Sequence, residues 1–495
     1  MEQKSNNRAT FQSRLGFILV SAGCAIGLGN VWKFPYVCGQ NGGGAFILLY
    51  LLCLVLLGLP ILICEFAIGR GSGRSLSQAF EKLEQPGSRY HYTKYTSIAG
   101  NYLLMMFYTM VTGWMLYYAF RYITGNIDAS STEMTANEFS NMLQSPVVML
   151  IFAAIVIAGC IGICALGLQN GIEKVTKFMM LFLMGLMVVL AVNSIRLKGA
   201  SEGLKFYLVP DFKKLFENGI TSVLFAAMTQ AFFTLSVGIG AMEIFGSYLK
   251  KERTLVGESL NVILLDTGVA IVAGLIIIPA CFAYGIKPDS GPNLLFITLP
   301  NVFHHMALGR LWGSLFFIFM SFAALSTVIA VFENIITMTV ELGNWSRKKS
   351  AIINLAAIFV LSIPAILGFN VLSSVQPLGK GTTIMDLEDF LVSSNLLPLG
   401  SLVVVLFCVR KNGWGWDDFR NEVNTGKGKH LPNALRLYIT YVVPALICII
   451  YLKGYYDTFS GKSLPIFIFW MIFAVLLLGL IFWASFSKKK AVIKN

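Results

Sequence analysis

The feature that most constrains the fold of this chain is a pair of interruptions in its apolar segments. The first apolar segment holds three glycines and an asparagine between Gly23 and Asn30, and a later one holds Ser236, Gly238 and Gly240. Lipid offers no hydrogen-bond partners to an opened backbone, so a broken helix survives at bilayer depth only where protein, water or a bound ion faces it. Two breaks at corresponding places in two halves of a chain indicate a substrate and ion site near the middle of the membrane.

Composition places the chain among multi-pass membrane proteins. Hydrophobic residues make up 56% of the 495 residues and charged residues 13%, a balance typical of chains with many apolar spans. Residues 1–10 are polar and the apolar segment after them lacks a small-residue cleavage pattern, so we expect no cleaved signal. We expect twelve spans, near residues 13–36, 42–69, 92–123, 146–166, 169–195, 218–247, 256–284, 311–340, 351–369, 384–409, 434–452 and 464–486.

Lysine and arginine residues predict the orientation. With both termini in the cytoplasm, most of these residues fall inside, including Arg70, Arg74, Lys250, Lys251, residues 347–349 and residues 488–490. The exterior loop from Lys198 to Lys214 runs against this rule. Attraction of lysine and arginine residues to the anionic lipids of the inner leaflet accounts for the net charge of +13. We therefore expect the lipid bilayer as a partner and no nucleic acid.

Cysteine usage also bears on the compartment. The nine cysteines lie in the apolar spans or, for Cys38, directly after one, without metal-ligand spacing, and the loop at 124–145 has neither a cysteine nor a glycosylation sequon. We therefore expect no disulfides and no metal cluster. The expected location is the plasma membrane, the inner membrane of a bacterium, with many spans and both termini cytoplasmic.

The chemistry of the chain lies at the two breaks. A helix that stops inside the membrane leaves carbonyls with partial negative charge on one half and amides with partial positive charge on the other. Asn30, Thr234 and Ser236 add neutral oxygen atoms, which suit a hard monovalent cation. The sequence has no phosphate-binding loop, nucleophile elbow or HExxH motif, so we do not expect an enzyme.

Several long motifs resemble those of the neurotransmitter:sodium symporter family in its bacterial amino-acid branch. They are Arg14-Leu15-Gly16 through Asn30, Phe34-Pro35-Tyr36, Asn41-Gly42-Gly43-Gly44-Ala45-Phe46, Phe107-Tyr108 and Gln230 to Gly240. The resemblance covers essentially the whole chain. It implies an all-α polytopic membrane protein with twelve transmembrane helices in two inverted five-helix repeats, with helices 1 and 6 broken. The implied division is a tail at 1–12, repeats at 13–195 and 218–410, peripheral helices at 434–486 and a tail at 487–495.

The resemblance implies two sodium sites. The first would use the carbonyl of Ala25, the side chains of Asn30 and Thr234, the substrate carboxylate and a residue of the seventh span. Asn261 is one candidate for that residue, but aligning Gly274 with the family's glycine favours Asp266. A carboxylate at this depth is costly unless a cation or a proton neutralises it, and here it would do the work of chloride in animal members. The second site would use carbonyls and hydroxyls of Gly23, Ile26, Ala323, Ser326 and Thr327.

The resemblance also implies the substrate class. Amine carriers of the family have an aspartate where this chain has Gly27, and glycine leaves room for the carboxylate of an α-amino acid. That carboxylate would bind the amides of Leu28 and Gly29 and the hydroxyl of Tyr108, and the ammonium would meet carbonyls of Ala25, Phe233 and Thr234. The uncharged pocket for the side chain would be lined by Leu104, Tyr108, Phe233, Ser236, Ile239, Thr327 and Val331, and fits branched or aromatic ligands.

Two pairs resemble the family's gates. Lys33 and Asp389 would close the exterior side, where lysine makes a less directional pair than the usual arginine. Arg8 and Glu341 would close the interior side, near Phe11, Ser247 and Tyr248, and Glu65 would brace the opened sixth span. The fifth span has Gly171 but has Leu181 in place of a proline that helps that span unwind in the family, so the interior route departs from the pattern.

The leading hypothesis is a sodium-coupled symporter that imports a neutral, hydrophobic or aromatic α-amino acid by alternating access without chloride. One alternative is a related carrier driven by protons or by exchange. Another is a substrate sensor with the same fold and no turnover. Complete sets of sodium ligands favour the symporter over a carrier driven by protons or exchange. Gate pairs at both faces favour it over a sensor without turnover. The fold by itself does not decide between these functions. The sequence does not indicate an oligomeric state.

Overall fold

The computed structural model describes residues 9–217, 219–285 and 293–486. Within these ranges the protein is helical and has no strand apart from one isolated bridge between Arg253 and Lys427. Ten helices are long and apolar enough to cross a membrane, and a bent pair supplies an eleventh. These findings confirm the predicted fold class of an all-α polytopic membrane protein.

The first half of the chain contains the bent pair, in which the axes of α1 and the following helix differ by 58°. Ser13 caps α1 by accepting from the amide of Gly16, and Ile26 ends it in an extended conformation. The helices of this half are α1 (Arg14–Ala25), η1 (Gly29–Lys33), α2 (Phe34–Gln40), α3 (Gly44–Cys53), η2 (Leu54–Gly58), α4 (Leu59–Ser72), α5 (Leu76–Leu83), η3 (Tyr90–Tyr92), α6 (Thr93–Thr124), α7 (Thr132–Gln144), α8 (Pro146–Ala165), η4 (Leu168–Glu173) and α9 (Lys174–Ile195).

The second half contains the second break. The apolar helix α12 ends at Thr234, the chain opens over residues 235–240, and α13 follows; together they occupy the expected sixth span. The helices are α10 (Ala200–Leu208), α11 (Phe212–Glu217), α12 (Ile220–Thr234), α13 (Ala241–Gly246), α14 (Leu255–Ala283), η5 (Leu294–Thr298), α15 (Leu299–His305), α16 (Gly309–Gly343), α17 (Arg347–Leu367), α18 (Ile384–Asp389), η6 (Phe390–Leu396), α19 (Leu397–Val409), α20 (Trp416–Asn424), η7 (Asn433–Leu435), η8 (Tyr438–Val442), α21 (Val443–Phe459) and α22 (Leu464–Phe486).

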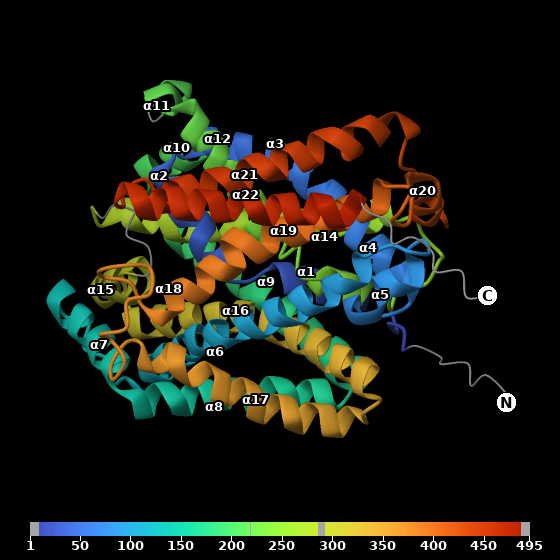
Figure 1. The fold of residues 1–495 in the computed structure, drawn as a ribbon. Coiled ribbons are helices and arrows are strands. Elements are labelled where there is room, and N and C mark those ends of the chain that lie inside the picture. Colours follow the sequence, from blue (N-terminus) through green and yellow to red (C-terminus); the bar gives the residue numbers. More distant parts are fainter. Residues whose placement is uncertain (1–8, 218, 286–292, 487–495) are drawn as a thin grey trace, which may run out of the picture.

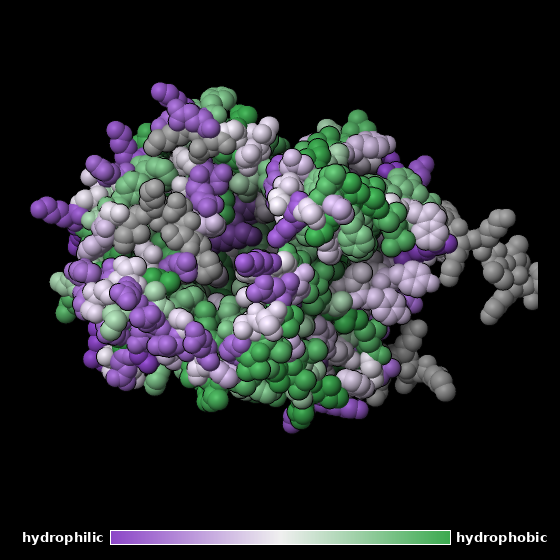
Figure 2. All heavy atoms as spheres, turned by 60° about the vertical axis from the view of Figure 1, so that its left-hand side comes forward, coloured by the Kyte–Doolittle hydropathy of each residue, from purple (hydrophilic) through white to green (hydrophobic). Residues whose placement is uncertain are grey.

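The long helices run along one common direction, and the connections between them alternate between the two ends of the bundle (Figure 1). The short helices α5 and α20 lie at one end, and α7 and α15 lie at the other. This alternation agrees with the predicted order of spans. In Figure 2 the end with α7 and α15 comes forward; it is hollowed near its centre, with hydrophilic side chains around the hollow and hydrophobic side chains on the flanks.

The broken helices lie at the centre of the bundle. α1 packs against α9, α14 and α16, and α13 packs against α4 and α16. The most apolar window of α16 is 78% buried, whereas that of α22 is 11% buried, so α16 is a core helix and α22 lies on the periphery. α8 and α17 pack together along the opposite flank (Figure 1).

Two glycines of α14 provide a matched test of this packing. A Cβ atom on Gly274 would lie 2.2 Å from the Tyr207 hydroxyl oxygen, whereas a Cβ atom on Gly268 would meet nothing within 4 Å. We predict that Gly274→Ala lowers the free energy of unfolding by about 1–3 kcal/mol, as overpacked sites do. Gly268→Ala should be neutral or stabilising because alanine favours a helix. Thermal unfolding in detergent measures both, and equal melting temperatures would contradict the close approach.

Candidate functional site

The first break is held open by side chains from other helices. The amide of Leu28 donates to the hydroxyl of Tyr108 at 3.0 Å, and the carbonyl of Gly29 accepts from the side chain of Gln230 at 2.9 Å. The amide of Gly27 donates to the Asn30 side-chain oxygen at 3.3 Å. Buried backbone groups need such partners, so α6 and α12 are required for the broken conformation of the first span.

The second break is held by α4 and α6. The carboxylate of Glu65 accepts from the amide of Gly238 at 2.5 Å, and the carbonyl of Ile239 accepts from Ser97 at 3.1 Å and from Asn101 at 2.9 Å. Gly238 and Gly240 have φ angles of 104° and 75°, which glycine adopts without a steric penalty. Ser236 has a φ of 50°, a strained value that a side chain rarely adopts outside functional sites.

The structure brings together the three side chains proposed for the first sodium. Asn30 donates to Thr234 and to the Asp266 carboxylate, both at 2.8 Å. The hydroxyl of Thr234 donates to the other carboxylate oxygen at 2.9 Å, and all three residues are fully buried. Within the described part of the chain, no lysine, arginine or histidine pairs with Asp266. Asp266, and not Asn261, therefore joins this cluster.

Four of the five residues proposed for the second sodium also meet, namely Ile26, Ala323, Ser326 and Thr327. Ser326 donates to the carbonyls of Ala323 at 2.9 Å and Ile26 at 3.3 Å. Thr327 donates to the carbonyls of Cys24 at 3.2 Å and Ile26 at 3.4 Å. Gly23 lies one position before Cys24 in the last turn of α1, against Thr176 and Met180 of α9. The Cys24 carbonyl is an oxygen of this cluster that the sequence did not indicate.

Gly27 stands between the two clusters. A Cβ atom on Gly27 would lie 2.5 Å from the Tyr108 hydroxyl oxygen and 2.6 Å from the Thr327 hydroxyl oxygen. No L side chain fits there without moving one of these groups, so an acidic residue at position 27 is incompatible with this arrangement. The hydroxyl of Ser236 points to the same region and donates to the Cys24 carbonyl at 3.5 Å.

The residues predicted for the side-chain pocket come from helices that surround the breaks. Leu104 lies one turn before Tyr108 on α6, and Val331 lies one turn after Thr327 on α16, and these two helices pack together. Phe233 is the last but one residue of α12, and its ring contacts the position of Gly29, where a Cβ atom would be 2.9 Å from the ring. Ile239 also borders a cavity of about 250 Å³ between α6, α19 and α22.

The gate residues take positions that the sequence did not fully indicate. The ammonium of Lys33 lies 3.8 Å from the centre of the Phe233 ring, and Asp389 accepts from Ser393 at 2.6 Å; no ion pair joins Lys33 and Asp389. Glu341 accepts from the amide and the hydroxyl of Ser75, at the start of α5. The predicted partner of Glu341, Arg8, lies outside the described residues.

An ion pair between a buried glutamate and a partly exposed arginine, which sequence reasoning missed, lies near the α5 end of the bundle. Arg347, at the start of α17, pairs with Glu333 of α16, and Arg347 also donates to the carbonyl of Cys164 at 2.8 Å. Tyr248 donates to Glu333 at 2.7 Å, and its ring lies 6.0 Å from that of Phe11. A charged residue inside an apolar helix is the sequence signal that could have identified Glu333.

The entry of α1 at this end is held by two further carboxylates. Glu173 accepts from the amides of Gln12 at 2.9 Å and Ser13 at 3.2 Å, and Glu258 pairs with Arg14 at 3.0 Å. The helix that follows Glu173, α9, is continuous from Lys174 to Ile195 and passes through Leu181 without a kink residue. Glu173, the residue just before α9, therefore connects the start of α9 to the start of α1 by hydrogen bonds.

Taken together, two broken helices that meet at buried hydroxyls, carbonyls and one carboxylate define a secondary transporter with discontinuous helices. The family model of the Sodium:neurotransmitter symporter family matches residues 8–145 and 140–487, and the chain belongs to that family. It is therefore a multi-pass membrane protein of a sodium-dependent transporter family, and it is not an enzyme.

Individual relatives agree with this assignment. An uncharacterized sodium-dependent transporter of Bacillus subtilis is 37% identical over 89% of this chain and 96% of its own length. A taurine transporter of Bos taurus, named as sodium- and chloride-dependent, is 26% identical over 90% of this chain and 78% of its own. The crystal structure of MhsT in complex with L-phenylalanine has a TM-score of 0.81 and 39% identity, and the match covers 90% of this chain and all of that one.

The Glu333–Arg347 pair gives a prediction about stability. Arg347→Met leaves a buried carboxylate without its cation, which costs about 3–5 kcal/mol of unfolding free energy. The double variant Glu333→Gln/Arg347→Met should recover much of this loss because its neutral amide needs no cation. Thermal unfolding of the purified variants in detergent measures both effects. A double variant no more stable than Arg347→Met would show that the unpaired charge is not the cause.

Proposed function

We propose that this protein is a sodium-coupled symporter that imports a neutral, hydrophobic or aromatic α-amino acid by alternating access. The observation that carries the proposal is the buried Asn30–Thr234–Asp266 cluster, in which a carboxylate without a cationic partner lies beside a broken helix. A buried carboxylate is costly unless a cation or a proton neutralises it. A sodium ion supplies that charge, and it reaches the carboxylate through the opened span.

We propose two sodium sites. The first combines the Ala25 carbonyl, Asn30, Thr234 and Asp266 with the carboxylate of the substrate. The second combines the Gly23, Ile26 and Ala323 carbonyls with the hydroxyls of Ser326 and Thr327. In support of the second, both hydroxyls already lie within 3.4 Å of the Ile26 carbonyl. Neutral oxygens at such distances suit a monovalent ion that is bound and then released.

The substrate carboxylate is proposed to bind between the first break and Tyr108. Its partners are the amides of Leu28 and Gly29 and the hydroxyl of Tyr108, which the Leu28 amide already contacts. The ammonium group meets the carbonyls of Ala25, Phe233 and Thr234. The crowding around Gly27 supports an amino acid over an amine, because an acidic side chain that would bind an amine has no room there.

The remaining ligand side chain is proposed to contact Leu104, Phe233, Ser236, Ile239, Thr327 and Val331. This set carries no charge, so it favours an apolar ligand. The L-phenylalanine bound by MhsT, at 39% identity, agrees with that class.

Closure on the exterior side is proposed to involve Lys33 and Phe233 together with Asp389. An ammonium over an aromatic ring is stabilised by about 0.5–2 kcal/mol, more when water is excluded. Phe233 lines the proposed ligand pocket, and Lys33 of the exterior gate contacts its ring. Opening or closing of the gate at Lys33 would therefore affect the position of Phe233 against the ligand. On the interior side, Glu341 is the described member of the proposed Arg8–Glu341 gate. The proposed location is the bacterial inner membrane with both termini in the cytoplasm.

Uptake into proteoliposomes tests this function. An inward sodium gradient should drive uptake of one or more apolar amino acids among the twenty, and removing sodium should abolish it. Thr327→Ala should lower the apparent sodium affinity because one ligand oxygen is lost. Ser321→Ala removes a hydroxyl from the same helix that bonds its own turn at Phe317, and it should leave sodium dependence unchanged. Uptake driven equally well by a proton gradient without sodium would refute the proposal.

Asp266 gives a prediction about charge. Two sodium ions and a zwitterion carry two positive charges inward, and each gains about 2.3 kcal/mol per 100 mV of inside-negative potential, so uptake should be electrogenic. Because Asp266 supplies the balancing negative charge, replacing chloride with gluconate should leave uptake unchanged. Asp266→Ser should abolish uptake or make it depend on chloride. Wild-type uptake that stops in gluconate would overturn this role of Asp266.

A further inference from the structure

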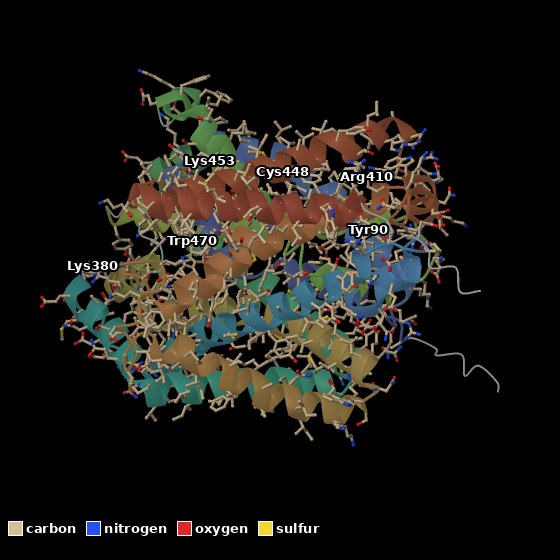
Figure 3. The ribbon with its side chains drawn as sticks, in the orientation of Figure 1. Tyr90, Lys380, Arg410, Cys448, Lys453 and Trp470 are labelled. Atoms are coloured by element: carbon tan, nitrogen blue, oxygen red, sulfur yellow. The ribbon has the colours of Figure 1, made fainter. Side chains whose placement is uncertain are left out.

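A second, basic cavity lies far from the breaks, where α19, α22 and the start of η8 meet. Its volume is about 610 Å³, and its lining includes Arg410, Lys411 and Arg436 but no acidic residue. Figure 3 shows Arg410 at the same end of the bundle as Tyr90, opposite the end that carries Lys380 and Trp470. By the proposed topology this end faces the cytoplasm.

Within residues 9–217, 219–285 and 293–486, no side chain neutralises the three cations of this cavity. Among the described residues, none of Arg410, Lys411 and Arg436 takes part in an ion pair. The Nε atom of Arg410 is buried and has no hydrogen-bond partner in the described structure. A buried guanidinium nitrogen without a partner costs free energy, and with no ion pair in the described structure the charge of this guanidinium is left for an anion from outside the protein to balance.

The position of Arg410 is set by its surroundings. Its guanidinium lies 4.2 Å from the centre of the Phe486 ring at the end of α22, which holds the planar group by cation–π contact. The neighbouring Asn412 donates to the carbonyl of Ser485 and ties the loop after α19 to α22. A guanidinium fixed in this way presents its free N–H groups in a fork that matches the oxygens of a phosphate.

The other walls of the cavity are apolar and open to the outside of the bundle. Leu437 is 69% exposed, Tyr441 60% and Phe486 55%. In a membrane these side chains face lipid, so a ligand that fills the cavity needs an anionic part at the arginines and an apolar part along this wall. Inorganic phosphate has only the first.

We propose that this cavity binds the phosphate group of an anionic glycerophospholipid of the cytoplasmic leaflet, with Arg410 and Arg436 as its main partners. Basic pockets between helices at the cytoplasmic face are suited to such headgroups. Lys411 adds charge, and the acyl chains follow the wall formed by Leu437, Tyr441 and Phe486. The site is independent of the proposed sodium and substrate sites.

Lipid binding to the purified full-length protein tests this site. The protein in neutral detergent is titrated with phosphatidylglycerol or phosphatidylcholine, and native mass spectrometry measures retained lipid. Wild type should retain phosphatidylglycerol about ten-fold more tightly than phosphatidylcholine, and Arg410→Gln/Arg436→Gln should lose most of that preference. Arg410→Lys, which keeps the charge without the fork, should lose part of it.

A control variant removes the same charge elsewhere. Lys174→Gln/Lys348→Gln changes two cations at the starts of α9 and α17, and it should retain the wild-type preference. Sodium-driven uptake by both double variants verifies that they are folded. Equal retention of phosphatidylglycerol by Arg410→Gln/Arg436→Gln and wild type would overturn the proposal. So would displacement of the lipid by millimolar inorganic phosphate, which would indicate a site for a soluble anion.

Discussion

The structure depends on one constraint, which is that backbone groups opened inside a membrane must find partners in the protein. The amide of Gly238 finds Glu65, and the carbonyl of Ile239 finds Ser97 and Asn101. The first break uses Tyr108 and Gln230 in the same way. Lipid supplies no substitute for these partners. The need to satisfy the opened backbone therefore explains why α4, α6 and α12 carry polar residues at depths where most neighbours are apolar.

The two breaks are satisfied by partners of different strength. Glu65 holds the second break with a charged acceptor at 2.5 Å, and hydrogen bonds to charged groups are the stronger ones. The carbonyls of Cys24 and Ile26 in the first break are met by neutral hydroxyls at 3.2–3.5 Å. Long bonds of this kind are easily exchanged for bonds to a cation. The carbonyls of Cys24 and Ile26 are therefore the backbone groups described at the two breaks that change partners most easily, whereas the Gly29 carbonyl is held by Gln230 at 2.9 Å.

Much of this arrangement could be predicted from sequence, because glycines and hydroxyls inside apolar spans mark the breaks directly. The same pattern identified Asn30 and Thr234, whereas the resemblance to the symporter family identified Asp266; the structure brings the three residues into contact. It did not indicate that Lys33 would lie over Phe233, because a long side chain chooses among many rotamers by tertiary contacts. The Cys24 carbonyl was missed for a related reason, since the sequence does not fix where a helix end turns its carbonyls.

Three buried carboxylates, those of Glu333, Glu65 and Asp266, differ in whether the protein itself balances their negative charge. Glu333 is paired with Arg347, so its charge is balanced by a side chain of the protein. Glu65 accepts from a backbone amide at the second break, where the helix end contributes positive potential. Asp266 accepts from a neutral amide and a neutral hydroxyl, and neither donor carries a full charge. A carboxylate that is fully buried with neutral donors retains most of its need for a cation, and this is the physical reason for proposing Asp266 as a place where a cation binds.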